Sequence, residues 1–171
     1  MAALAEPVVL DATVLSNFAS SDAVGWLAET VPGLAVVPAV HEELAAGRDH
    51  GYAFLEQALD PLGDAIPVLS ADDSTTPTAP AIRDRLDTGE AASLRAAINR
   101  GGTLATDDLA ARRLAAEHDV PVTGSVGLLV VGIQHGELDI TTADEWLATW
   151  REVRGYYAPV DSVEAALPDE E

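Results

Sequence analysis

Residues 7–20 read PVVLDATVLSNFAS, and this stretch indicates how the chain folds. Its first four residues, PVVL, form a short apolar run of the kind found in a strand buried on both faces of a parallel sheet. Asp11 follows at once, and residues 13–20 then carry a helical pattern of apolar side chains. A buried strand that passes through one acidic residue into a helix is the opening unit of an α/β fold.

The same alternation continues through the rest of the chain. Further short apolar runs predict strands at residues 34–37, 66–69, 103–106 and 120–123. Helical periodicity predicts helices at residues 13–20, 22–30, 39–46, 50–59, 89–99, 108–118, 126–135 and 142–150. Strands that alternate with helices indicate an α/β fold built in layers around a mainly parallel sheet.

Length and composition support one folded domain. The chain has 171 residues, of which 48% are apolar, so a sizeable core is expected and wholesale disorder is excluded. We expect one domain over residues 1–155 and an acidic tail over 156–171 that frays from about Ala158. Residues 70–80, rich in Ser, Thr, Pro and Asp, predict an exposed loop.

Composition also limits the chemistry. The chain has no cysteine, which excludes disulfides, thiolate zinc sites and a cysteine nucleophile. Any metal must therefore bind to oxygen or histidine. The sequence shows no basic and apolar leader and no apolar run of roughly 18 residues, so we expect a cytoplasmic protein without membrane contact.

The formal net charge is -20, and all nine basic residues are arginine. Such a surface repels itself in dilute buffer, whereas molar salt shortens the Debye length to about 3 Å and screens the repulsion. We therefore expect an extreme halophile as the source. In molar salt the counterion contribution to nucleic-acid binding is small, so the negative charge argues only weakly against a nucleic-acid substrate.

Acidic residues recur where the predicted elements meet. Asp11 directly follows the first strand, and Asp107 and Asp108 follow the run TLAT at 103–106. Glu43 lies in the helix after the second strand, and Glu90 opens the helix at 89–99. In open α/β sheets the ligand crevice lies beyond the carboxyl ends of the strands. These acids are thus candidates for a common site.

Each acid also has a purely local interpretation. Asp11 has the position of a helix N-cap, and Asp87 with Glu90 has the spacing of a capping box. Asp107 and Asp108 suit the first turn of a helix, where they complement its dipole. Helix capping does not explain why two separate strands both deliver an acid to the same edge of the sheet.

The functional interpretation is that three or four carboxylates converge on one or two Mg²⁺ or Mn²⁺ ions. Hard divalent cations prefer oxygen ligands, and Mg²⁺ commonly bridges protein carboxylates and a substrate phosphate. Such a site supports hydrolysis of a phosphodiester bond. Closely packed carboxylates repel one another, so without metal one or more should have a raised pKa.

Five segments, taken together, resemble the PIN-domain family. They are DATVLSNF at 11–18, VPAVHEEL at 37–44, GEA at 89–91, ATDDLAAR at 105–112 and VTGSVGLL at 122–129. The resemblance is to the archaeal and bacterial branch with Gly-Glu-Ala and Asp-Asp-x-x-Ala-Arg motifs. It implies a Rossmann-like three-layer α/β/α sandwich and Mg²⁺- or Mn²⁺-dependent endoribonuclease activity, as in the VapC toxins of toxin–antitoxin pairs. It also implies an RNA substrate, an antitoxin protein as partner and a homodimer.

The resemblance assigns roles by position. It places the catalytic and metal-binding acids at Asp11, Glu43, Glu90 and Asp107, with Asp108 as a further metal ligand. It suggests substrate contacts for Thr13, Arg112 and Ser125. Ser125 also suits a helix start, and Arg112 has the i,i+4 spacing for an ion pair with Asp108.

Other residues and function classes carry weaker signals. The four histidines have no partner at ligand spacing and suggest surface positions, while Trp146 and Trp150 suggest core or dimer packing. A catalytically silent PIN module that binds RNA or a protein is the alternative function. A dehalogenase-like phosphatase would need a second Asp at the position of Thr13, and a receiver domain would need a lysine, which this chain lacks.

Overall fold

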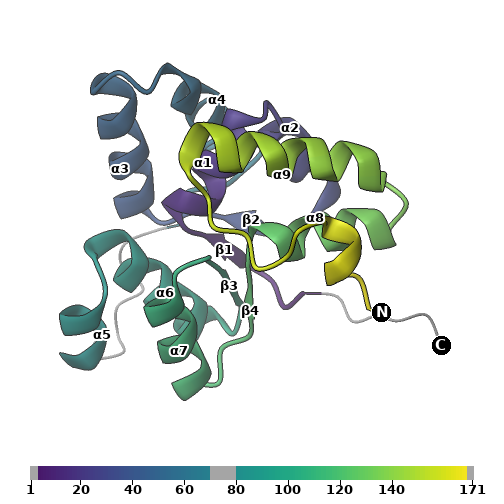
Figure 1. Ribbon diagram of the computed structural model, residues 1–171. Coiled ribbons are helices and arrows are strands. Elements are labelled where there is room, and N and C mark those ends of the chain that lie inside the picture. The colour runs from purple at the N-terminus through teal and green to yellow at the C-terminus, as the bar shows by residue number, and fades with distance from the viewer. Residues whose placement is uncertain (1–3, 70–79, 169–171) are drawn as a thin grey trace.

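The computed structural model describes residues 4–69 and 80–168. Within these residues four parallel strands form one sheet in the order β2-β1-β3-β4. Helices α6 and α7 lie on one side of the sheet, and α1, α8 and α9 lie on the other (Figure 1). This is the predicted three-layer α/β/α fold with a central parallel sheet.

The strands are β1 (Val8–Leu10), β2 (Leu34–Ala35), β3 (Thr103–Ala105) and β4 (Val122–Thr123). The helices are α1 (Ala12–Ser20), α2 (Val24–Thr30), α3 (Pro38–Asp49), α4 (Glu56–Leu59), α5 (Pro80–Arg85), α6 (Thr88–Arg100), α7 (Leu109–Glu117), α8 (Ser125–Gln134) and α9 (Ile140–Arg154). Two short 3-10 helices are η1 (Ala53–Leu55) and η3 (Val163–Ala166).

Strand β1 lies at the centre of the sheet. The chain leaves β1 for β2 on one side, and it returns to β3 on the other side. In the register between β1 and β3, Leu10 is opposite Ala105, so the two strands end level with each other. The strand order therefore reverses between β1 and β3, which is where open α/β sheets bind ligands.

The position of β1 within the core explains why the first strand is so apolar. All three residues of β1 are fully buried, as expected for a parallel strand covered by helices on both faces. Helix α1 adds Phe18, and α9 packs the buried Trp150 edge-on against the Phe18 ring with centroids 5.1 Å apart. Trp146 packs in the same manner against Trp26, so the expected packing role of both tryptophans is confirmed within the chain.

Four of the five predicted strands are confirmed, and the strand at residues 66–69 is wrong. Only an isolated bridge joins Val68 to Val36 beside β2. The backbone of Val36 donates to the Pro67 carbonyl and accepts from Leu69. Pro67 has no N–H to donate, so this segment cannot continue a regular ladder.

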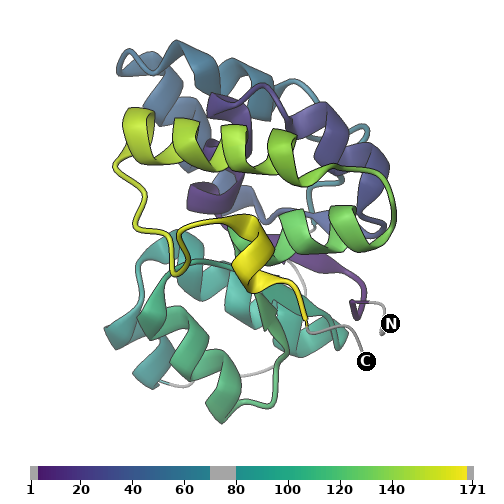
Figure 2. The same ribbon diagram turned by 45° about the vertical axis from the view of Figure 1, so that its right-hand side comes forward.

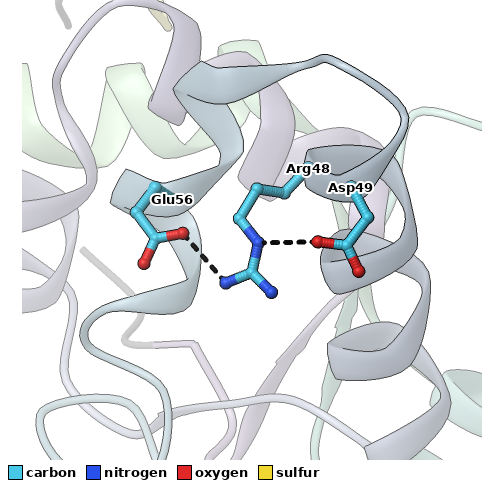
Figure 3. A network of polar contacts seen from close by, with 3 residues as sticks. All are labelled: Arg48, Asp49 and Glu56. Carbon is cyan, nitrogen blue, oxygen red and sulfur yellow. Dashed lines mark hydrogen bonds and ion pairs between the residues drawn. The ribbon is translucent and has the colours of Figure 1, made fainter.

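The helix predicted at residues 50–59 is also wrong as one element. Gly51 has a φ of +109°, which no α-helix accommodates, so the helical segment begins only with η1, which passes directly into α4. Arg48 at the end of α3 joins Glu56 of α4 at 2.9 Å and Asp49 at 3.3 Å (Figure 3). These exposed ion pairs contribute little stability, but they connect the two ends of this turn.

The remaining helices lie close to their predicted positions. Helix α5 was not expected, and residues 70–79 of the expected loop lie outside the described part of the chain. None of the helices in the described ranges is long and apolar enough to cross a membrane.

The fraying expected from Ala158 is wrong for the residues described, which reach 168. Val163 is fully buried, and its N–H and the Ser162 hydroxyl donate to the carboxylate of Asp144 on α9. The Arg151 guanidinium also donates to backbone carbonyls of this segment. The segment therefore returns across α8 and α9, as Figure 2 shows in yellow. A boundary between domain and tail at residue 155 stays a prediction.

Candidate active site

Asp11 lies at the end of β1 and begins α1. Its backbone is extended, with φ -82° and ψ 169°, and its Oδ1 accepts a hydrogen bond of 2.9 Å from the Val14 N–H. The N-cap interpretation is therefore confirmed. The other carboxylate oxygen, Oδ2, accepts a hydrogen bond from the Thr106 hydroxyl at the end of β3. Asp11 thus joins the ends of two neighbouring strands as well as capping a helix.

Asp107 follows β3 and turns toward α8 and α1. Its Oδ1 accepts from the Ser125 N–H at 2.9 Å, and its Oδ2 accepts from the Ser125 hydroxyl at 2.5 Å. The Asn17 amide lies 3.5 Å from the same Oδ2, and the Tyr156 hydroxyl donates to Oδ1 at 3.3 Å. Residues of α8, of α1 and of the segment after α9 therefore contact one carboxylate, which is more support than a helix cap requires.

Asp108 takes the local role instead. It is the N-cap of α7, and its Oδ2 accepts from the Ala111 N–H at 2.8 Å. Its own N–H donates to the Thr106 hydroxyl oxygen at 3.2 Å, which makes Thr106 a link between Asp11 and Asp108. Among the described residues no ion pair joins Asp108 to Arg112.

Glu90 and Glu43 approach from the helices. Glu90 completes the predicted capping box with Asp87, whose Oδ1 accepts from the Glu90 N–H at 2.8 Å while Glu90 Oε2 accepts from the Asp87 N–H at 3.3 Å. Helix α3 packs against α6 and brings Glu43 Oε2 beside Gly89. Partial burial, and then the charge of Asp87, raise the pKa of Glu43.

The acids affect one another electrostatically. The pKa of Asp11 is raised to about 6, because burial and then the charges of Asp107 and Glu43 outweigh the lowering effect of its two hydrogen bonds. Burial raises the pKa of Glu90 to about 7, and the nearby carboxylates, including Asp108 and Asp11, add to the effect. Asp11 therefore interacts electrostatically with Asp107, Glu43 and Glu90, and Glu90 also interacts with Asp108.

The donor set agrees in kind with a hard divalent cation, because every candidate ligand is an oxygen. None of the ion pairs among the described residues includes one of these acids, so no arginine there neutralises them directly. In the same residues no three acidic or histidine side chains stand close enough to form a ready-made metal cage. Mg²⁺ commonly binds to only one or two carboxylates and keeps several waters, so this open arrangement fits it.

The three predicted substrate residues have different surroundings. Thr13 is exposed and lines a cavity together with Glu43. The Arg112 guanidinium donates to the Thr106 carbonyl at 3.0 Å and lines a second cavity with Asp107. Ser125 is fully buried and directs both its N–H and its hydroxyl to Asp107. It is the first residue of α8 rather than its cap, which is Gly124.

Besides Tyr156, three residues of the site were not singled out from the sequence. Thr106 bonds to Asp11, and the buried Asn17 donates to Ser125 at 3.0 Å. Arg154, at the end of α9, donates through Nε to the Asn17 Oδ1 at 3.0 Å. Asn17 had a detectable signal, because it is an amide among the apolar positions of a helix that packs into the core. Arg154 had none, since arginine is common in the last turn of a helix.

The histidines add no ligands to the site. All four are exposed, as predicted: His41, His50, His118 and His135. Glu42 is exposed as well, in agreement with a surface position beside Glu43.

Comparison with known proteins agrees with this geometry. A family model described as a PIN domain matches residues 7–169, which is nearly the whole chain. No curated protein matches the sequence. PIN domains are in general nucleases, so the match indicates a nuclease-type function. By the extent of this match and by its fold, the chain belongs to the PIN-domain family.

Proposed function

We propose that this protein is a divalent-metal-dependent endoribonuclease that hydrolyses RNA phosphodiester bonds. The observation that carries the proposal is the meeting of Asp11 and Asp107 beyond the ends of the neighbouring strands β1 and β3. Glu43 and Glu90 add negative charge at the same edge. The raised pKa values indicate a site that favours a proton or a cation over isolated charges.

Mg²⁺ or Mn²⁺ would bind directly to one or two of the four acids Asp11, Asp107, Glu43 and Glu90, and to the others and Asp108 through its bound waters. When bound, such an ion activates water for attack on phosphorus and stabilises the leaving oxygen. The chain's own polar residues orient the carboxylates of the site. Thr106 fixes one oxygen of Asp11, while Ser125 and Asn17 fix Asp107.

The positive charge near the acids comes from Arg112 on one side and Arg154 on the other. Each guanidinium donates one hydrogen bond to a group that belongs to the site, namely the Thr106 carbonyl and the Asn17 amide oxygen. Arginine is well suited to phosphate oxygens, because its planar fork can donate two parallel hydrogen bonds. These two residues are the candidates for holding an RNA backbone near the acids.

The test is a cleavage assay on single-stranded RNA in high-salt buffer with Mn²⁺ or Mg²⁺. We expect cleavage that EDTA abolishes and that the Asp11→Asn and Asp107→Asn variants lack. These variants, purified in the same way, also control for a contaminating nuclease. Cleavage by the wild type that persists in EDTA, or equal cleavage by the variants, would reject the mechanism. Metal binding to a folded protein without cleavage would favour a silent PIN module that binds RNA or a protein.

We further propose that the protein acts as a VapC-like toxin in the cytoplasm, as a homodimer with an antitoxin partner. The support is the set of motifs around Asp11, Glu90 and Asp107, together with the PIN-domain fold. Growth arrest on expression, relieved by Asp11→Asn and by co-expression of a small upstream gene, is the expected result. Light scattering at high salt measures the oligomeric state. Growth unaffected by an active enzyme would exclude the toxin role.

A further inference from the structure

A cavity of about 430 Å³ opens beside the acids, between α1, α3, η1 and α9. Its lining includes Thr13, Glu43, Tyr52, Val153 and Arg154, and we call it the Arg154 cavity. This volume lies within the range of roughly 300–1,000 Å³ that is typical of small-molecule sites. Because Glu43 belongs both to the wall and to the acidic group, a ligand in this cavity lies next to the candidate active site.

Arg154 is the cation of the cavity. Its Nε donates to the Asn17 amide oxygen at 3.0 Å, and its guanidinium carbon lies 5.8 Å from the centre of the Phe54 ring. Among the described residues it forms no ion pair within 4.0 Å, although Glu43 lines the same cavity. Burial lowers the pKa of its guanidinium, in agreement with a charge held partly out of water. Its position is fixed by two neighbours, while its charge has no carboxylate partner there.

Tyr52 supplies an aromatic face at the same cavity. Its ring packs edge-on against Phe54 at 6.2 Å, yet 59% of the residue is exposed. Val153, which also lines the cavity, is 58% exposed. The backbone of Tyr52 donates to the Gly47 carbonyl at 3.2 Å and accepts from the Leu55 N–H at 3.0 Å, and the exposed Arg48–Glu56 ion pair spans the same turn (Figure 3). The exposed ring is therefore attached to a hydrogen-bonded turn.

We propose that the Arg154 cavity binds one nucleotide of an unpaired RNA strand, with a phosphate on Arg154 and the base stacked on Tyr52. The inference rests on the proposed ribonuclease function and assigns Tyr52 and Arg154 as the residues that bind a nucleotide beside the acids. A phosphate matches a positioned guanidinium that lacks a carboxylate partner. A base can stack on a protein ring only when it has left its own helix, so the ligand is single-stranded. An apolar protein segment would use Tyr52 and Val153 but would leave Arg154 without an anion.

Binding is measured by fluorescence anisotropy of a labelled single-stranded RNA of mixed sequence, in EDTA and over a series of KCl concentrations. Tyr52→Ala should weaken binding by roughly tenfold, whereas Tyr52→Phe should retain it, because stacking needs the ring and not the hydroxyl. Arg154→Gln should weaken binding and reduce the slope of log Kd against log salt by about 0.7, the value for one phosphate contact. Arg113→Gln, at an exposed arginine of α7 that lines neither cavity, is the matched control and should change neither quantity. Duplex RNA of the same sequence should bind more weakly to the wild type.

The outcomes separate this inference from the proposed function. A protein that cleaves RNA, but whose Tyr52→Ala variant binds single strands and duplex as the wild type does, overturns the nucleotide site and leaves the catalytic proposal intact. The cavity would then be free for a protein partner. Binding that depends on Tyr52 and Arg154 in a protein that never cleaves supports the site and rejects the ribonuclease. Because Tyr52 is mostly exposed, Tyr52→Ala remains decisive even if Arg154→Gln fails to fold.

Discussion

The hydroxyl of Thr106 donates a hydrogen bond to Oδ2 of Asp11, although the two residues are 95 positions apart in the chain. The contact exists because β1 and β3 are parallel neighbours that end level with each other. Burial raises the pKa of Asp11, and the Thr106 hydroxyl opposes this by stabilising the carboxylate. The bond therefore favours loss of the proton from Asp11, in opposition to the larger effect of burial.

Replacing Thr106 by Val tests this relationship, because valine has the same shape without the hydroxyl. The pKa of Asp11 should rise further above about 6, and the free energy of unfolding should fall by about 1–3 kcal/mol. Carbon-13 NMR titration of the side-chain carboxyl groups measures the pKa. Thr103→Val is the matched control: Thr103 is a buried threonine of the same strand, and its hydroxyl bonds to the Ala5 carbonyl. An Asp11 pKa that moves equally in both variants contradicts the assignment.

Asp11→Asn should stabilise the metal-free protein near neutral pH. Because the pKa of Asp11 is about 6 in the fold and near 3.8 in the unfolded chain, the folded state binds more protons between these values. Its contribution to stability is thus fully present below about pH 4 and is lost as the pH rises through 6. At pH 7.5 the loss is on the order of 3 kcal/mol, which the variant avoids. Urea unfolding in EDTA should show equal stability at pH 4 and a more stable variant at pH 7.5.

Two controls accompany the Asp11→Asn measurement. Asp139→Asn alters an exposed N-cap whose pKa is lowered by its bonds to Thr142, so that variant should not gain stability at neutral pH. Millimolar Mg²⁺ should stabilise the wild type by mass action and Asp11→Asn much less. Equal responses of the two proteins to Mg²⁺ would leave Asp11 as a helix cap only.

Metal affinity should increase with pH. Protons compete with the cation at Asp11, with a pKa of about 6, and at Glu90, with a pKa of about 7. The Kd for Mn²⁺ should therefore be at least about tenfold weaker at pH 5.5 than at pH 7.5. Calorimetric titration in buffers of different ionisation enthalpy counts the protons released on binding. An affinity that is constant over this range would place the metal on other groups.

Replacing Asn17 should lower the rate of RNA cleavage, although Asn17 is not one of the predicted metal-binding acids. It donates to Ser125 and Asp107 and accepts from Arg154, so Asn17→Ala removes the link between the acid and the cation. Loss of such supporting contacts typically costs about 10–100-fold in metal affinity or activity. Ser20→Ala, on the same helix, removes only a hydroxyl that donates to the Asn17 carbonyl and should leave cleavage unchanged. Equal rates for both variants would contradict a positioning role for Asn17.

Salt should stabilise the protein strongly. With a net charge of -20, repulsion opposes the compact state at low ionic strength, and it fades as the Debye length shortens to about 3 Å at molar salt. The unfolding temperature should rise steadily as KCl is increased from about 0.1 M to 3 M. Calorimetric scans measure it. A temperature that stays flat over this range would argue against adaptation to high salt.

The elements and the acids were predictable because their signals are local. The apolar run before Asp11, the spacing of Asp87 and Glu90, and Pro38 at the start of α3 each act within a few residues of the chain. The same locality explains the errors. An apolar run such as residues 66–69 resembles a strand in isolation, but only its neighbours decide whether it pairs, and here it forms only two isolated bridges.

The sequence by itself determined the α/β alternation, the exclusion of cysteine chemistry and the five candidate acids. Only the tertiary structure decided that Asp107 faces Ser125 and Asn17 while Asp108 caps α7, although the two acids are adjacent in the chain. The tertiary structure alone also placed Arg154 against Asn17, 137 positions away. Capping and periodicity depend on neighbouring residues, whereas these contacts depend on the strand order and on how α1, α8 and α9 pack together. The helices pack because burial of apolar surface is favourable, and this driving force is non-directional. It does not specify which polar side chains come into contact, so a local sequence pattern cannot predict those contacts.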